Sequence, residues 1–275
     1  MWSQQKYIPF EDEVREAIQK DIIEKNPDVE ISYYFRNLRN GPWFWYNEEA
    51  IFAPASLMKL PVTMGYMKWA EEDPVVWSKA FTGITENTSV QNIVPGETVE
   101  SGLSYNLDTL IKYSLIFSDN NANSTLLANI PQELLFRVFR ELNIPIIDNL
   151  EQGQDEYITV KEYASFFRIL FNSSYLSRAS SEHLLKIMSL AENTRGIKQK
   201  IPPSIPVSHK FWERWGISKR TWEFTQQFHD CGIVYYSNYP YLLCVMTRWT
   251  DGFDNLETII EDISYEIFTT ISSYY

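Results

Sequence analysis

The stretch FAPASLMKLP, residues 52–61, places a serine and a lysine three positions apart at the start of a predicted helix. Three positions are nearly one helical turn, so the side chains of Ser56 and Lys59 lie on one face of that helix. A serine hydroxyl becomes a nucleophile when a base takes its proton, and a lysine can be that base if burial or nearby positive charge destabilises its ammonium form. The helix N-terminus adds positive potential and offers backbone N–H groups to an oxyanion.

This S-x-x-K pattern has a plain structural alternative. Ser56 can be a helix N-cap, and Lys59 a solvated lysine one turn later. Ser3 and Lys6 match the same pattern near the N-terminus of the chain, so the match alone discriminates poorly. Its meaning depends on the other motifs.

A second motif, Ser118-Asp119-Asn120, falls at the break between two predicted helices. A loop at this point can direct a hydroxyl and an amide toward a site formed by another segment. Helix capping is the alternative, because Ser, Asp and Asn all favour helix starts. Ser104-Tyr105-Asn106 matches the same S-x-N pattern.

A third element is Lys210, which follows His209 on the first strand predicted after residue 200. A lysine in the middle of a strand is usually a solvated charge at a sheet edge. In a functional site, Lys210 would keep Lys59 deprotonated by repulsion and attract an anionic substrate.

Outward from these motifs, the hydrophobic pattern changes twice along the chain. Alternating apolar residues predict strands at 29–38 and 43–47, and again at 206–215, 228–236 and 241–249. Apolar residues three and four apart predict helices at 10–25, after residue 56, and at 107–117, 123–130, 131–142, 159–171, 181–192 and 255–268. Thr159 and Ser180 are typical helix N-caps.

This order predicts an α/β fold of layered α+β type, with one antiparallel sheet built from both chain ends and flanked by terminal helices. Residues 1–60 and 200–275 would form the lobe that contains the sheet, and residues 61–199 an inserted all-helical lobe. The polar loop at 147–158 is expected to be exposed.

Composition excludes several classes of function. The net charge of −12 and pI of about 4.8 disfavour nucleic-acid binding, since phosphate backbones are repelled. The apolar runs fall short of the roughly 20 residues that span a bilayer. Nucleotide, zinc-protease and lipase motifs are absent from the sequence, and its three histidines have no ligand spacing, so no metal or cofactor is expected. The N-terminal residues carry no signal-peptide pattern, which fits either an intracellular protein or a mature form.

The two cysteines, Cys231 and Cys244, flank a predicted hairpin centred on Ser237-Asn238. In that register they face each other across the strands, so a disulfide can form in an oxidising compartment. The alternative is a pair of buried free thiols that fill small gaps in the core.

The three motifs occur in an order that resembles the penicillin-recognising serine enzymes, most closely the class A β-lactamase-like family. The resemblance covers nearly the whole chain and rests on SYYFRNL…GPWFWYNEE, FAPASLMKLP, IFSDNNANSTLL, PVSHK, HDCGIVYY and LLCVMTR. It implies a sheet from both chain ends beside a helical lobe, with the site between them. It also implies a monomer outside the cytoplasm, in the periplasm or medium, that acts on a β-lactam or peptidoglycan-like substrate.

The resemblance assigns roles to individual positions. Ser56 would be the acylated nucleophile, Lys59 its base, and Ser118 the relay that passes a proton to the leaving nitrogen. Asn120 would contact the substrate amide, and Lys210 would face the substrate carboxylate.

Two further positions of the strand depart from the family pattern. The family has Thr or Ser and then Gly after the strand lysine, whereas this chain has Phe211 and Trp212. A hydroxyl for a substrate carboxylate is thereby lost, and Trp212 narrows the cleft if it points inward. The oxyanion hole would use the backbone N–H groups of Ser56 and Glu213.

The E-x-x-L-N loop of class A β-lactamases, whose glutamate releases the acyl group, is also missing. Glu141-Leu142-Asn143 has the wrong spacing, and Glu151, Asp155 and Glu156 lie in the right region without the motif. The resemblance therefore implies a serine hydrolase with slow deacylation. A D-Ala-D-Ala peptidase and a non-catalytic relative, its cleft filled by Trp212, are the alternatives.

Overall fold

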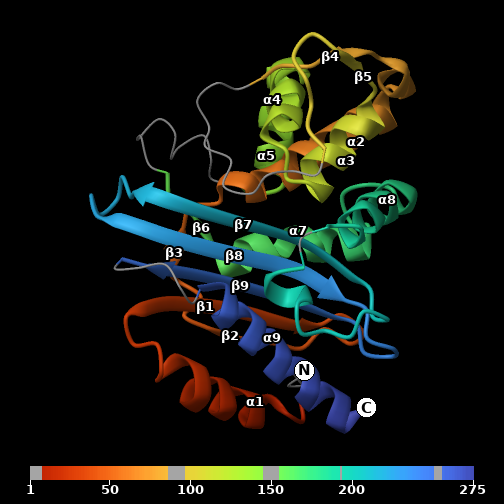
Figure 1. Cartoon of the computed structure of the whole chain (residues 1–275). Coiled ribbons are helices and arrows are strands. Elements are labelled where there is room, and N and C mark those ends of the chain that lie inside the picture. The colour runs from red at the N-terminus through yellow and green to blue at the C-terminus, as the bar shows by residue number, and fades with distance from the viewer. Residues whose placement is uncertain (1–7, 86–96, 145–154, 193, 251–255) are drawn as a thin grey trace.

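The computed structural model describes residues 8–85, 97–144, 155–192, 194–250 and 256–275. A five-stranded antiparallel sheet, in the order β2-β1-β9-β8-β7, lies between two groups of helices (Figure 1). β1 pairs with β9 along its whole length, so the two ends of the chain meet in the middle of the sheet. The predicted fold class is confirmed. The strands are β1 (Val29–Asn37), β2 (Trp43–Tyr46), β7 (Val207–Ile217), β8 (Phe224–Val234) and β9 (Tyr241–Trp249).

The central position of β9 follows from its sequence, YLLCVMTRW. Successive side chains of a strand point to opposite faces of the sheet. Leu243 and Val245 enter the core shared with the terminal helices, whereas Leu242 and Met246 enter the core shared with the other helices. A strand with apolar residues on both faces is stable only where both faces are covered.

The terminal helices cover one face of the sheet, as the periodicity predicts (Figure 1). α1 (Glu11–Ile18) continues as a π-helical turn (Gln19–Ile23) and buries Val14 and Ile18. α9 (Leu256–Tyr274) buries a stripe of isoleucines against the same face. Within the described ranges, no helix is both long enough and apolar enough to cross a membrane.

The other helices lie on the opposite side of the sheet, where α7 (Val160–Asn172) and α8 (Arg178–Ser189) pack directly on the strands (Figure 1). They are α2 (Lys59–Glu72), α3 (Leu107–Ile116), α4 (Asn120–Asn129), α5 (Gln132–Glu141), α7 (Val160–Asn172) and α8 (Arg178–Ser189). Short 3-10 turns occur at η2 (Ala55–Met58), η3 (Pro74–Ser78) and η4 (Gly196–Lys198), and two-residue strands form the pairs β3 (Ile51–Phe52) with β6 (Ile158–Thr159) and β4 (Phe81–Thr82) with β5 (Ser104–Tyr105). The lobe limits at residues 60 and 200 stay a prediction.

Two expectations about helix starts have different outcomes. Thr159 is the N-cap of α7, and it forms a reciprocal capping box with Glu162. Ser180 is not a cap, because α8 begins earlier, after Ser177, whose hydroxyl accepts the N–H of Ser180. Both serines lie in one turn, and only the first has the extended backbone that a cap requires.

The expectation of an exposed loop at 147–158 is wrong at its C-terminal end. Residues 147–154 lie outside the described part of the chain. Asp155 is half-buried and Glu156 is buried. Arginines on β7 and β9 pair with these carboxylates and draw them toward the sheet.

The cysteines form a disulfide between β8 and β9, which resolves the choice left open by the sequence. Cys231 pairs with Cys244 in the antiparallel register, as predicted from the hairpin. The connection is longer than two residues, since β8 ends at Val234 and β9 begins at Tyr241. Its centre still lies at Ser237-Asn238, so the register is unchanged.

Reduction of this disulfide is expected to lower the free energy of unfolding by about 3 kcal/mol, because the unfolded chain gains the entropy of an open loop. The cysteines are 13 positions apart in sequence. Urea unfolding with and without reductant measures the effect, and the Cys231→Ala/Cys244→Ala double variant, which reductant should not affect, is the control. Two thiols that react in unreduced, denatured protein would contradict the pairing.

Candidate active site

The segment before α2 places Ser56 at the edge between the sheet and the helices. Ser56 lies inside the 3-10 turn η2, which has no side-chain cap, and it is partly exposed. The next residue, Leu57, is buried, and its carbonyl accepts a hydrogen bond of 3.1 Å from the Tyr163 hydroxyl of α7. Ser56 is therefore not an N-cap, and the alternative given by the sequence is wrong.

Lys59, the first residue of α2, is only 2% exposed. Its Nζ donates to the Ser118 backbone carbonyl, to Ser118 Oγ at 3.2 Å, and to Asn120 Oδ1 at 2.7 Å. The alternative of a solvated lysine is wrong as well. The structure joins the S-x-x-K lysine to both polar ends of the S-D-N motif.

In the Ser118-Asp119-Asn120 motif, Asp119 stabilises the local loop and the start of α4, whereas Ser118 and Asn120 contact Lys59 in the candidate site. Asp119 caps α4 by accepting the N–H groups of Asn121 and Ala122, and it also accepts hydrogen bonds from residues 98–99. Ser118 has φ +54°, in the left-handed region that side chains seldom adopt. Asp119 thus anchors the loop in the conformation that directs the Ser118 hydroxyl toward the lysines.

Lys210 approaches the same hydroxyl from the edge strand β7. Its side chain is 0% exposed, and its Nζ donates to Ser118 Oγ at 2.8 Å and to the Phe211 carbonyl at 3.3 Å. The Ser118 hydroxyl therefore lies between two amines, those of Lys59 and Lys210. Burial lowers the pKa of Lys210 to about 7, against the opposing effect of the Asp230 carboxylate. The solvated edge charge is ruled out.

A buried pair of polar residues, His209 of β7 and Asp230 of β8, joins these two strands. His209 Nδ1 lies 3.0 Å from both oxygens of Asp230, and Asp230 also accepts the backbone N–H of Ile197 at 2.8 Å. Gly232 is required opposite His209, because a Cβ at this position would lie 2.6 Å from the Cβ of His209. The Asp230 carboxylate of this pair favours the charged form of Lys210 and so raises its pKa, against the larger lowering caused by burial.

The residues after Lys210 alternate between the two faces of β7. Phe211 packs in the core on the α9 side, and Glu213 pairs with Arg195 at 3.5 Å. Trp212 belongs to the core on the helical side, is 5% exposed, and its ring centroid lies 5.1 Å from that of His229. The assignment of the Glu213 backbone N–H to an oxyanion hole stays a prediction.

A buried network around Glu156 was not predicted from the sequence. This carboxylate is 1% exposed, and it accepts hydrogen bonds of 2.8 Å from Arg248, Arg220 and Gln227. Gln227 in turn accepts the N–H of Ala53 at 3.1 Å.

The network holds the strand that leads to Ser56. Arg248 donates to the carbonyl of Ile51 at 3.1 Å, and Gln227 accepts the N–H of Ala53, two residues further along the chain. The available signal was Arg248 at the end of the largely apolar strand β9 and Gln227 within β8, since a buried Arg and a buried Gln both require partners. Among the described residues, no group of three or more His, Cys, Asp or Glu is placed to hold a metal ion.

Replacement of Glu156 by Gln is expected to lower the free energy of unfolding by about 3 kcal/mol, since removal of one member of a buried ion pair leaves the other charge uncompensated. Asp155→Asn is the matched control. Its pair with Arg214 is partly exposed, so a loss below about 1 kcal/mol is expected. Urea unfolding measures both variants, and equal losses would show that burial of Glu156 has no special role.

The sequence profile described as beta-lactamase enzyme family matches residues 13–271. PBP-A is 17% identical, with a TM-score of 0.75 over 95% of this chain and 97% of its own. A class A β-lactamase from Bacteroides cellulosilyticus is 16% identical, with a TM-score of 0.74 over 94% of this chain and 99% of its own. A β-lactamase from Sphaerobacter thermophilus is 15% identical, with a TM-score of 0.74 over 96% of this chain and 97% of its own.

At these identities the similar structures support the fold alone. The search of curated proteins finds no match. The family profile nevertheless spans nearly the whole chain, including the S-x-x-K, S-D-N and strand-lysine positions. The chain belongs to the beta-lactamase enzyme family.

Proposed function

We propose that this protein is a serine hydrolase that is acylated at Ser56 by β-lactams or related amides and esters, and that releases the acyl group slowly. The observation that carries the proposal is the Ser118 hydroxyl between Lys59 and Lys210, beside the turn that bears Ser56. One of the similar structures is a mutant of PBP-A, described as an acyl-enzyme complex with penicillin G.

In the proposed acylation, Lys59 in its neutral form takes the proton of Ser56 as the Ser56 oxygen bonds to the substrate carbonyl carbon. The C–N bond then breaks. The proton passes from Lys59 through the Ser118 hydroxyl to the leaving nitrogen, so protons balance within the site. The positive charge of Lys210 favours an anionic substrate, and Asn120, which already contacts Lys59, would bind the substrate amide.

Slow deacylation is supported by the state of the acidic residues near the missing motif. Glu156 is buried and accepts hydrogen bonds from two arginines, and Asp155 pairs with Arg214 at 2.5 Å. A carboxylate that is fully engaged in this way is poorly placed to activate water. Glu151 lies outside the described residues.

The alternatives receive less support. A D-Ala-D-Ala peptidase is expected to bind the terminal carboxylate of its substrate with a strand hydroxyl in addition to Lys210, and Phe211, which stands in place of that hydroxyl, has its side chain in the core on the α9 side. A binding-only relative would have Trp212 over Ser56, whereas the ring of Trp212 is buried against His229. We further propose a monomer in the periplasm or outside the cell, with no nucleic-acid partner, and the disulfide supports an oxidising compartment.

Incubation with penicillin G is expected to add one acyl group to Ser56, detected by intact-mass spectrometry and located by peptide mapping. Ser56→Ala should show no adduct. Ser118→Ala should acylate roughly a hundredfold more slowly, because a proton relay is lost. Ser104→Ala, in the second S-x-N sequence, is the control and should react like the original protein. An adduct that persists in Ser56→Ala would contradict the assignment.

The acylation rate should also depend on the charge of Lys210. Its pKa of about 7 means that the ammonium is present below that pH and lost above it. The rate with anionic penicillin G, divided by the rate with neutral para-nitrophenyl acetate, is therefore expected to fall as pH rises through about 7. Lys210→Arg should flatten this ratio, because guanidinium stays protonated. A constant ratio in the original protein would contradict the role of Lys210.

A further inference from the structure

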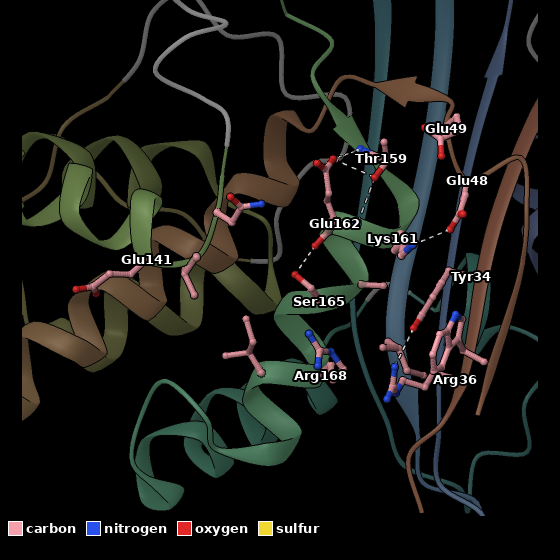
Figure 2. A pocket seen from close by; sticks show the side chains of 16 residues that line it. Tyr34, Arg36, Glu48, Glu49, Glu141, Thr159, Lys161, Glu162, Ser165 and Arg168 are labelled. Carbon is pink, nitrogen blue, oxygen red and sulfur yellow. Dashed lines mark hydrogen bonds and ion pairs between the residues drawn. The ribbon is translucent and has the colours of Figure 1, made fainter. Parts of the chain in front are cut away.

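A second cleft, of about 680 Å³, opens between the sheet and α7, away from the candidate active site. Its walls come from β1 and β2, the loop at 48–49, the end of α5, and one face of α7 (Figure 2). None of Ser56, Lys59, Ser118 and Lys210 lines it. The cleft is therefore a distinct site and requires its own explanation.

Most of the charged groups in this cleft already have partners. Lys161 pairs with Glu48 at 3.1 Å, and Glu162 is used in the capping box of α7. Glu141 accepts a hydrogen bond of 2.6 Å from the Tyr175 hydroxyl. These groups build the walls of the cleft and do not define what binds in it.

Two arginines remain without a carboxylate partner in the part of the chain that the structure describes. Arg36 extends from β1 and Arg168 from α7, and both line the cleft. Figure 2 shows both side chains in the same part of the cleft, opposite the end occupied by Glu49. The cleft as a whole is lined by three basic and four acidic side chains, so the two arginines form a local positive region within a cleft and a chain that are otherwise acidic.

The position of Arg36 is set by aromatic neighbours. Its Nη1 donates to the Tyr34 hydroxyl at 3.3 Å, and its guanidinium carbon lies 5.0 Å from the ring centroid of Trp43. Trp43 is 43% exposed, so its ring forms part of the open wall. Contacts of this kind hold a guanidinium in place and leave its remaining N–H donors available to a ligand.

We propose that this cleft binds an organic oxyanion, a carboxylate or a phosphate joined to an aromatic or apolar group. Arg36 and Arg168 would bind the oxyanion, since the planar guanidinium matches both anions through paired N–H donors. The Tyr34 and Ser165 hydroxyls lie beside them. Trp43, Leu142 and Ile169 would contact the apolar part of the ligand. The proposal is independent of the chemistry at Ser56.

Isothermal titration calorimetry with three probes tests it: inorganic phosphate, phenyl phosphate and benzoate. Saturable binding of phenyl phosphate or benzoate is expected, and it should be tighter than binding of inorganic phosphate because the ring adds apolar contact. The organic probe that binds more tightly identifies the anion as phosphate or carboxylate.

Arg168→Gln and Arg36→Gln should each weaken binding by about tenfold or more, since each removes a charge-assisted hydrogen bond. Arg140→Gln, an exposed arginine of α5 outside the cleft, is the matched control and should bind like the original protein. Circular dichroism and thermal melting verify that each variant is folded. Because the Arg168 side chain is exposed, Arg168→Gln should fold like the original protein and tests the proposal even if Arg36→Gln is unstable. The absence of saturable binding would overturn the proposal. Unchanged affinity in Arg168→Gln would also overturn it, and would place the anion at Lys210.

Discussion

The contact on which the candidate site depends is the Ser118 hydroxyl held between Lys59 and Lys210. Two buried amines beside one hydroxyl are costly, because a charged amine loses its hydration on burial and two charged amines would repel each other. The structure offsets this cost with the oxygens of Asn120 and of the Ser118 backbone at Lys59, and with the nearby Asp230 carboxylate at Lys210. Residual desolvation lowers the pKa of Lys210 into the range where its charge responds to pH. The start of α2, the loop before α4 and the edge strand β7 must all be in register for this contact to form.

The sheet supplies that register. β9 is buried on both faces and pairs with β1 and β8, so it fixes the strands that carry the polar supports. Lys210 lies opposite Cys231 in the β7–β8 pairing, and Cys231 is joined to Cys244 of β9. The disulfide therefore lies in the same row of the sheet as the candidate active-site lysine, and it ties the strand beside β7 to the centre of the core. The Glu156 network performs the corresponding task for the segment before Ser56.

α7 connects the two sites described for this protein. On one side, its Tyr163 hydroxyl holds the carbonyl of Leu57, next to Ser56. On another, Arg168 lines the second cleft. α7 also packs against β9 in the core, so Tyr163 and Arg168 both extend from a helix whose position the core fixes. Binding groups on a packed helix keep their positions better than groups on a loop.

The sequence alone determined the order of strands and helices, the sheet formed from both chain ends, the Thr159 cap and the facing cysteines, because each depends on periodicity or spacing within a short segment. It also identified Ser56, Lys59, Ser118, Asn120 and Lys210 as candidates, but left each with a solvated or capping alternative. Only the tertiary structure decided that Lys59 and Lys210 are buried and that both contact the Ser118 hydroxyl. It also decided that Trp212 packs against His229 and that Glu156 is buried. Arg36 and Arg168, far apart in the sequence, line the same cleft only in the folded chain. The physical reason is that desolvation and hydrogen bonding between residues far apart in the chain are set by packing, which local periodicity does not encode.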